Sequence, residues 1–147
     1  MSLLQIKKLR ENAVIPKRAT EGSAGMDLYA CIDEPVTVMP HECYKFPTGI
    51  AIALESANFG AFIFARSGLS IKHGLAPANC VGVVDSDYRG EIIVGIVNQY
   101  ETPYTVEPGE RVAQMVIMPV DLPEIEVVDQ LDETIRADGG FGSSGKK

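Results

Sequence analysis

Short runs of β-branched and aromatic residues recur along the chain, separated at close intervals by prolines and glycines. The runs cover residues 3–9, 35–40, 49–54, 60–65, 81–85, 91–98, 104–120 and 124–131. Because the strands of sandwiches and barrels have this length and spacing, the pattern predicts an all-β protein. The segment 92–97 is apolar at nearly every position, which is typical of a strand covered on both faces by a thick core or by another subunit.

Local signals interrupt this pattern at three places. Residues 67–75 predict one helix of about two turns that ends at Gly74. Pro108 and Gly109 suit the two central positions of a type II turn, since the second position needs a positive φ. From Arg136 onward the chain has too few apolar residues to form a core. We therefore predict a single β domain over residues 1–135 and a flexible glycine-rich arm over residues 136–147.

Size and charge narrow the possible functions. A chain of 147 residues is long enough for one proper core. Its net charge of −7 opposes non-specific binding to nucleic acid. No apolar run reaches the roughly 20 residues that span a bilayer, and the N-terminus lacks the apolar region of a secretory signal. The three cysteines have no paired spacing. We expect a cytoplasmic protein, or a nuclear one in a eukaryote, that binds neither nucleic acid nor membranes.

The segment 79–98 carries the most informative chemistry. Two apolar runs flank a polar tip that contains Asp85 and Tyr88, which predicts a β-hairpin presenting a carboxylate and a ring on a rigid platform. A carboxylate fixed at a strand end can orient or deprotonate a water molecule. The alternative is a solvated turn, because aspartate and serine are common turn residues. The adjacent ring favours a ligand site.

Three further segments carry polar groups suited to a phosphate ligand. Arg66 and Ser67 stand where a strand gives way to the helix, which is typical either of an anion site or of an N-cap serine beside a surface arginine. Asp27 interrupts an apolar strand, and a carboxylate there needs a partner. The partner is either a hydrated Mg²⁺ or an arginine, and this segment taken by itself favours the arginine. Gln114 also interrupts an apolar strand, and it either binds a phosphate or faces solvent.

The C-terminal segment admits two interpretations. Its glycines and serines are typical of a disordered tail. Glycine backbone can instead approach and cradle phosphates, and the single aromatic residue Phe141 could stack on a base. Phe141 and Arg136 are the residues that a disordered tail leaves unexplained.

Taken together and in order, five segments resemble the motifs of the homotrimeric dUTPases, the deoxyuridine triphosphate nucleotidohydrolases. They are AGMDLYA, ARSGLS, GVVDSDYRGEI, GERVAQMVI and RADGGFGSSG, from residue 24 to residue 145. The resemblance implies a distorted β jelly-roll of the β-clip type and a homotrimer with active sites at subunit contacts. It also implies hydrolysis of dUTP to dUMP and pyrophosphate with Mg²⁺, which limits uracil in DNA and supplies dUMP for dTMP synthesis.

The resemblance also implies a role for each matching residue. Asp85 activates the water that attacks the α-phosphorus, and Tyr88 packs under the deoxyribose. The uracil is read by Asn79 and by backbone groups around Gly82 and Val84. The phosphates are held by Arg66, Ser67, Gly68 and Gln114. Asp27 contacts Mg²⁺ through its water ligands. The arm residues that close the site are Arg136, Phe141, Gly142, Ser143 and Ser144.

The departures from the family pattern are modest. Ala65, Ser70 and Val84 replace common alternatives, Ala137 stands where a glycine is usual, and Asp138 places a negative charge near the expected phosphates.

Two other functions stay open on the sequence. A dCTP deaminase shares the implied fold but needs a glutamate acting at the base, and a non-catalytic β-sandwich trimer could bind nucleotides without hydrolysing them.

Overall fold

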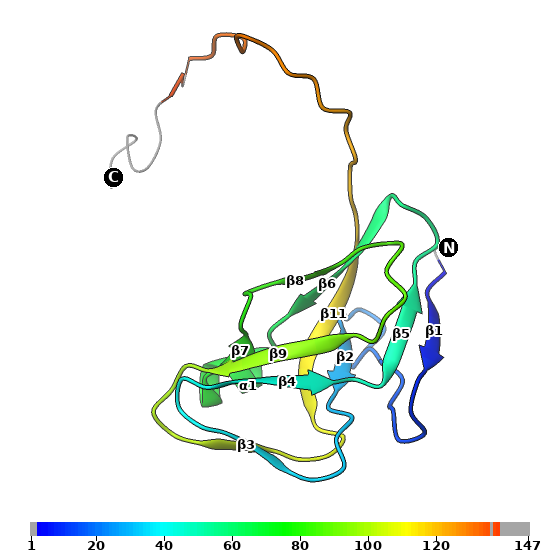
Figure 1. Cartoon of the computed structure of the whole chain (residues 1–147), viewed down its shortest axis with the longest axis vertical. Coiled ribbons are helices and arrows are strands. Elements are labelled where there is room, and N and C mark those ends of the chain that lie inside the picture. Colours follow the sequence, from blue (N-terminus) through cyan, green and yellow to red (C-terminus); the bar gives the residue numbers. More distant parts are fainter. Residues whose placement is uncertain (1–2, 136, 139–147) are drawn as a thin grey trace.

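The structure is a computed structural model that describes residues 3–135 and 137–138. Regular structure in these residues is almost entirely β, with one short helix at the edge of the body (Figure 1). The elements are β1 Gln5–Lys8, β2 Met26–Tyr29, β3 Val36–Val38, β4 Cys43–Pro47, β5 Ile50–Ala53, β6 Phe59–Phe64, α1 Ser67–His73, β7 Leu75–Pro77, β8 Gly82–Val84, β9 Ile93–Asn98, β10 Tyr104–Val106 and β11 Arg111–Pro119. The all-β prediction is confirmed.

Within the described residues the strands form four antiparallel sheets. The largest has the order β2-β11-β6-β8, and a second has the order β4-β9-β7. The other two are the pairs β1-β5 and β10-β3. Strands distant in sequence pair in every one of these sheets, so the fold depends on long-range contacts rather than on local hairpins.

Alternation along the strands builds the core. On β2, Met26 and Leu28 are buried, while Asp27 and Tyr29 face outward and are only partly covered. The largest fully buried side chains come from all parts of the chain and include Phe46, Leu28, Ile50, Leu75, Ile96 and Met115. Burying apolar side chains of this size stabilises the fold by roughly 1.5–3 kcal/mol each. The polar residues of the outward face are thereby fixed on a stiff support.

Strand β9 is covered on one face only within this chain. Val94 and Ile96 are buried, whereas Ile93 between two buried neighbours is 53% exposed. A thick core around both faces of this strand, one of the two interpretations of its sequence, is therefore wrong. The other interpretation, a contact with another subunit, stays a prediction.

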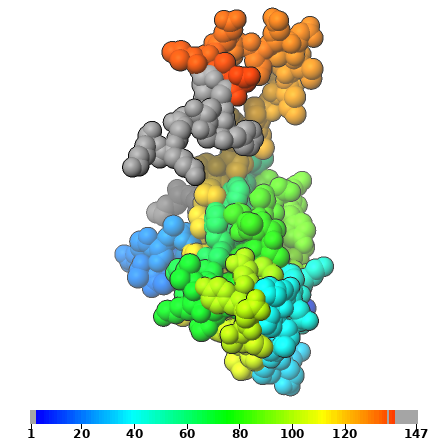
Figure 2. All heavy atoms as spheres, turned by 90° about the vertical axis from the view of Figure 1, so that its left-hand side faces the viewer, coloured from blue at the N-terminus to red at the C-terminus, as the bar shows by residue number. Residues whose placement is uncertain are grey.

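The segment after β11 differs from its predicted structure. Residues 124–131 were expected to form a strand, but they pair with no sheet among the described residues and extend away from the body, as Figures 1 and 2 show for residues 120–135. Ile125 is 92% exposed and Val127 is 93% exposed. The alternating pattern is present, but in the described structure the segment pairs with none of the free sheet edges.

The predicted helix and turn are confirmed. Helix α1 ends at Gly74, which has φ 73° and donates its N–H to the last carbonyls of the helix. Gly109 has φ 76°, and the Glu110 N–H donates to the Glu107 carbonyl at 3.0 Å, which closes the turn. The strands β4 and β7 were not predicted, because both are short and contain a proline. In the described part of the chain, no helix is long and apolar enough to cross a membrane.

Candidate active site

The segment 79–98 does not form the predicted hairpin. Strand β8 pairs with β6, with Val84 opposite Ala61 and Gly82 opposite Ile63. Strand β9 instead pairs with β4 and β7 in another sheet. Because the two strands join different sheets, they diverge and leave between them a pocket of about 270 Å³, here called the β8–β9 pocket.

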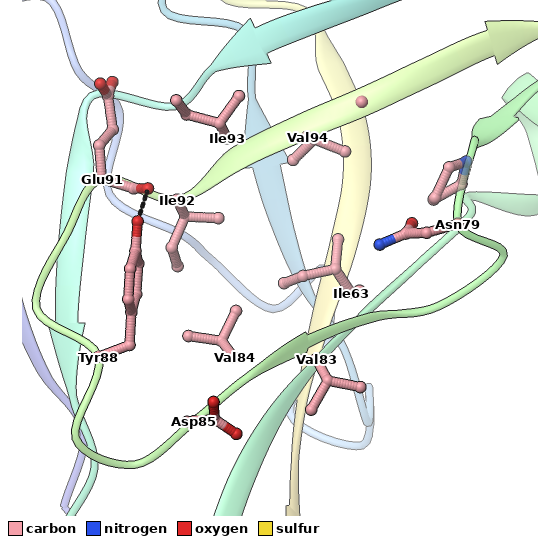
Figure 3. Close-up of a pocket in the computed structure, with 13 residues that line it drawn as sticks. Ile63, Asn79, Val83, Val84, Asp85, Tyr88, Glu91, Ile92, Ile93 and Val94 are labelled. Atoms are coloured by element: carbon pink, nitrogen blue, oxygen red, sulfur yellow. Dashed lines mark hydrogen bonds between the residues drawn. The ribbon is translucent and has the colours of Figure 1, made fainter.

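Apolar side chains form the middle of this pocket, and polar groups stand at its ends. Figure 3 shows four apolar residues gathered between the two chain segments, namely Ile63, Val84, Ile92 and Val94. The amide of Asn79 points toward them from one end, and Asp85 and Tyr88 lie at the other. In addition, β8 is an edge strand of its sheet, so its outer N–H and C=O groups face the pocket side without a ladder partner in the described structure. This arrangement suits a flat ring with polar edges.

The loop between the two strands is tied to the body. The Tyr88 hydroxyl donates to the Glu91 carbonyl at 3.0 Å (Figure 3). The Glu91 carboxylate accepts from the Gly49 N–H at 2.8 Å, and the Thr48 hydroxyl donates to the Ile92 carbonyl at 2.6 Å. These bonds fix the end of the loop against the start of β5. The tip is therefore held at its base although its side chains are exposed.

Gly90 sets the position of the Tyr88 ring. A Cβ atom built at Gly90 would lie 2.5 Å from Cζ of Tyr88, far inside van der Waals contact. The ring lies directly over this glycine, and any larger residue there would displace it. The orientation of Tyr88 therefore depends on the absence of a Cβ atom at Gly90 as well as on the hydrogen bond to Glu91.

Asp85 follows the last residue of β8 and is exposed. Among the described residues its carboxylate forms no ion pair. The Asp85 carbonyl accepts from the Tyr88 N–H at 3.2 Å, which fixes the main chain of the turn. A carboxylate without a protein partner at the mouth of a pocket can hold and polarise a water molecule.

A second group of predicted residues converges at the far end of the same large sheet. Gln114 on β11 stands opposite Asp27 on β2 and opposite Phe64 on β6. Its amide donates to the Ala65 carbonyl at 2.9 Å. Arg66 donates its Nε–H to Oδ1 of Asp27 at 2.8 Å. The arginine partner that the sequence favoured for Asp27 is therefore confirmed.

Sequence reasoning missed one member of this group. Arg111 donates from Nη1 to Oδ2 of Asp27 at 3.3 Å, so Asp27, Arg66 and Arg111 form what is called here the ion-pair cluster. Arg111 reaches the face that carries Asp27 because β11 contains an irregularity between Arg111 and Ala113. The extra residue buries both Val112 and Ala113 and changes the phase of the strand. Strict alternation in the sequence predicts the opposite face for Arg111.

Ser67 and Gly68 begin helix α1 and are exposed. The N-cap of this helix is Arg66, and no side chain caps it in the described structure. The alternative of an N-cap serine is therefore wrong, since the Ser67 hydroxyl does not bond to its own helix end. Ser67, Gly68 and the ion-pair cluster share one surface beside Gln114.

One chain does not bring the two groups of residues together. Ala61 on β6 pairs with Val84, and Arg66, the N-cap of α1, follows five residues later in the chain, past the end of β6 and in the direction away from Asp85. At about 3.3 Å per residue, Arg66 is roughly 15–20 Å from Asp85 along the sheet. Base, sugar and water-activating candidates therefore occupy one end, and phosphate-binding candidates occupy the other.

The described residues fit a hydrated Mg²⁺ but not a directly chelated metal. They contain no group of three or more His, Cys, Asp or Glu side chains that could hold a metal ion. The Asp27 carboxylate has about four acceptor positions, of which the two arginines use two, so it can still accept from water ligands of a metal. Mg²⁺ commonly keeps several waters and binds substrate phosphates. The predicted arm residues Arg136, Phe141, Gly142, Ser143 and Ser144 lie outside the described residues.

Comparison with known proteins identifies the family to which this site belongs. The sequence model of the dUTPase family matches residues 11–145. The chain belongs to the dUTPase family. It is 56% identical, over 89% of its length and 87% of the relative's length, to the deoxyuridine 5'-triphosphate nucleotidohydrolase of Desulfitobacterium hafniense strain DCB-2. It is 46% identical, over 95% of its length and 92% of the relative's, to the enzyme of the same name from Idiomarina loihiensis.

Solved dUTPase structures share the fold. A variant of the phage 80alpha dUTPase superposes with a TM-score of 0.87 at 28% identity and covers 97% of this chain and 98% of its own. Another variant of the Staphylococcus bacteriophage 80alpha dUTPase, with dUpNHpp, has a TM-score of 0.85 at 27% identity and covers the same shares of both chains. A phage phi11 dUTPase variant that coordinates a structural Mg(II) ion has a TM-score of 0.80 at 25% identity, over 89% of this chain and 99% of its own. The jelly-roll and dUTPase predictions are confirmed, and the chain is an enzyme of this family.

Proposed function

We propose that this dUTPase hydrolyses dUTP to dUMP and pyrophosphate by attack of a water held by Asp85 on the α-phosphorus. The observation that carries the proposal is the position of the Asp85 carboxylate, which lies beside Tyr88 at the mouth of the β8–β9 pocket and forms no ion pair with any described residue. The high identity to proteins named as deoxyuridine triphosphate nucleotidohydrolases supports the substrate. Such a reaction limits uracil in DNA and supplies dUMP for dTMP synthesis.

The β8–β9 pocket supports recognition of a pyrimidine. Its apolar walls pack against both faces of a ring, while Asn79 and the free edge of β8 around Gly82 and Val84 offer donors and acceptors to the ring's polar edge. Hydrogen bonds to a fixed edge discriminate strongly, since a wrong base leaves buried polar groups unpaired. The Tyr88 ring, held over Gly90, packs under the sugar and opposes a 2′-hydroxyl.

The chain's own groups perform the chemistry by placement and charge. Asp85 orients the water and accepts its proton, while Arg66, Ser67, Gly68 and Gln114 bind the phosphate oxygens. Phosphoryl transfer needs the attacking and leaving oxygens in line and the developing charge neutralised. The leaving pyrophosphate carries the electrons of the broken bond. The site is closed over the bound substrate by the arm residues Arg136, Phe141, Gly142, Ser143 and Ser144, and this closure excludes bulk water.

Mg²⁺ supplies charge neutralisation on the phosphates when it is bound. Asp27 would hold it through water ligands, since its carboxylate keeps free acceptor positions beside the two arginines. A phage phi11 dUTPase variant coordinates a structural Mg(II) ion, which supports the proposal that Mg²⁺ binds here. No other described carboxylate is needed for this role.

The separation of the two groups of residues supports a homotrimer with shared active sites. Because Asp85 and Arg66 are roughly 15–20 Å apart along one sheet, one triphosphate reaches both only if they come from different subunits. The exposed Ile93 and the long segment after β11 provide surface and reach for such an assembly. A closed threefold ring generates three identical shared sites.

Pyrophosphate release from each deoxynucleoside triphosphate and from UTP tests this function. We expect release from dUTP in the presence of Mg²⁺ and at least about a hundredfold lower kcat/KM for dCTP, dTTP and UTP. Release of ammonia from dCTP would instead identify a deaminase. Binding of dUpNHpp without any pyrophosphate from dUTP would identify a nucleotide-binding module.

A further inference from the structure

We propose that Arg111 and Asp27 are positioning residues that set how Arg66 meets the triphosphate, and that Arg111 itself does not bind phosphate. This inference rests on the proposed function, because it takes Arg66 as a phosphate ligand. It is carried by the hydrogen bonds of the ion-pair cluster. Arg111 was not among the site residues expected from the sequence.

The Asp27 carboxylate is the centre of the cluster. Its side chain is only 14% exposed, and its two oxygens face two different arginines. Oδ1 accepts from Nε of Arg66 at 2.8 Å, and Oδ2 accepts from Nη1 of Arg111 at 3.3 Å. A largely buried carboxylate needs its charge compensated, and the two arginines provide that compensation.

Arg66 is held at two points. Besides its bond to Asp27, it donates from Nη1 to the carbonyl oxygen of Arg111 at 3.4 Å. A guanidinium has five N–H donors in one plane, and bonds at two of its nitrogens fix the orientation of that plane. The bonds that Arg66 makes to described residues use two of the five donors, which leaves three for phosphate oxygens.

Arg111 therefore acts on Arg66 twice, once through its carbonyl and once through Asp27. The irregularity in β11 makes this possible, because it turns Arg111 to the same face as Asp27 while Val112 and Ala113 stay buried. The Arg111 side chain is half exposed, and the Arg66 side chain, at 26%, is better covered. The shielded arginine is the one that lies next to Gln114 and Ser67.

The chemical consequence concerns how many donors Arg66 keeps. An arginine and a carboxylate prefer two parallel hydrogen bonds. Arg111 occupies Oδ2 of Asp27, so Arg66 pairs with this carboxylate through one oxygen only. Without the Arg111 guanidinium, the acceptor position of Oδ2 that it uses is free for a second N–H of Arg66. The guanidinium would then turn toward Asp27, and fewer of its donors would reach the phosphates.

The test is the affinity of Arg111→Gln for two ligands, measured without Mg²⁺ in EDTA. We expect isothermal titration to show about tenfold weaker binding of dUpNHpp, and a dissociation constant for phosphate-free deoxyuridine within about twofold of the wild-type value. Arg18→Gln, which removes an exposed arginine outside both site regions, is the matched control and should change neither value. Equal losses for both ligands, or no loss, would overturn the proposal.

A double-mutant cycle separates positioning from direct binding. In the Arg66→Gln background, Arg111→Gln should have no further effect on dUpNHpp affinity, because the residue it positions is gone. A further tenfold loss would show that Arg111 binds phosphate itself. Arg111→Lys keeps the charge beside Oδ2 and should restore most of the affinity, which also keeps the test valid if Arg111→Gln fails to fold.

Two further results distinguish the failure of this inference from failure of the proposed function. If the wild-type enzyme binds no dUpNHpp, the proposed function itself is wrong. If the wild type binds it and Arg111→Gln binds it equally well, only the positioning role is wrong. Asp27→Asn should weaken dUpNHpp binding even in EDTA, whereas a role limited to the water ligands of Mg²⁺ predicts loss only when the metal is present.

Discussion

Asp85 and Asp27 are two aspartates at opposite edges of one sheet, in surroundings that differ completely. The sheet order β2-β11-β6-β8 puts Asp27 on one outer strand and Asp85 just beyond the other. Asp27 is largely buried and faces two arginines, whereas Asp85 is exposed and has no ion-pair partner among the described residues. The Asp27 carboxylate is bound by protein side chains, and the Asp85 carboxylate is accessible to solvent and substrate.

The two regions also gain their rigidity in different ways. The loop that carries Tyr88 is held by hydrogen bonds that each join a side chain to a main-chain group, and the Tyr88 hydroxyl and the Glu91 carboxylate take part in them. The Asp85 carboxylate forms no ion pair with a described residue, which leaves it available to a ligand. The ion-pair cluster is held by the charged side chains themselves. An acid that must accept a proton has to stay unpaired, while a cation that must bind phosphate benefits from a fixed orientation. The comparison therefore assigns turnover to the first region and phosphate affinity to the second.

The largest expected effect comes from removing the charge of Asp85. Asp85→Asn should lower kcat by at least about a thousandfold, because the amide cannot accept a proton from water. The affinity for dUpNHpp, measured by isothermal titration, should change less than about fivefold, since the side chain holds water rather than substrate.

Asp87→Asn is the matched control, because it removes the same charge from an exposed position two residues away. It should retain most of the wild-type kcat. A rate near that of the wild type for Asp85→Asn would remove Asp85 from the mechanism and with it the division of roles between the two aspartates.

A second experiment tests whether the two regions of one site come from different subunits. Asp85→Asn and Arg66→Gln are each expected to be nearly inactive. After unfolding and refolding together in equal amounts, about a quarter of all sites should combine an intact Asp85 with an intact Arg66 from a neighbour, and activity should return to that extent. Refolding each variant alone is the control. If both regions belonged to one chain, the mixture would stay as inactive as its components.

The parts of the fold that the sequence predicted are those set by local conformation. The end of α1 at Gly74 and the turn at Gly109 need a positive φ, which glycine adopts without strain, so a single residue type reveals them. The predicted hairpin and the predicted strand over residues 124–131 failed because strand pairing depends on distant partners. Two strands adjacent in sequence joined different sheets, and one strand-like segment pairs with no described strand.

The site shows the same limit. Gln114 was predicted because it interrupts an apolar strand, and Asp85 and Tyr88 because they stand in a polar tip between two apolar runs. Asn79 was predicted only through the resemblance to the dUTPases. The structure places all four on exposed or partly covered faces. Arg111 was missed because a one-residue irregularity in β11 reverses the face that alternation predicts for it. No signal in a single sequence indicates such an irregularity. The arm residues belong to the part of the chain that the structure does not describe, so their roles stay predictions.

A third prediction concerns selectivity in the Asp85 region. Gly90→Ala should displace the Tyr88 ring, because a Cβ there would lie 2.5 Å from Cζ of Tyr88. The ratio of kcat/KM for dUTP to that for UTP should fall about tenfold, since the ring no longer opposes a 2′-hydroxyl. Gly22→Ala is the control, because among the described residues a Cβ at Gly22 meets no atom within 4 Å. A loss of rate with unchanged selectivity would show that Gly90 affects folding rather than discrimination.

The smallest expected effect concerns the turn that precedes Arg111. The Tyr104 hydroxyl donates to Glu110 at 2.6 Å, and the other oxygen of this carboxylate accepts from the Glu107 N–H at 2.9 Å. Burial, together with this hydrogen bond and the charge of Glu110, raises the pKa of Tyr104 from 10.0 to about 12. The folded protein therefore keeps a proton that the unfolded chain loses above pH 10. The stabilisation from Tyr104 is complete below pH 10 and is lost as the pH rises toward about 12.

Tyr104→Phe removes both the hydrogen bond and this titration. The free energy of unfolding, measured in urea at pH 7, should fall by about 1 kcal/mol, the usual value for a partly exposed hydrogen bond. Between pH 10 and pH 12 the difference between variant and wild type should shrink, because the wild type alone loses the contribution of Tyr104. If the turn also supports the ion-pair cluster, dUpNHpp affinity will fall while deoxyuridine inhibition is unchanged. An unchanged affinity for both ligands would show that β2 and β11 alone hold Arg111 in place.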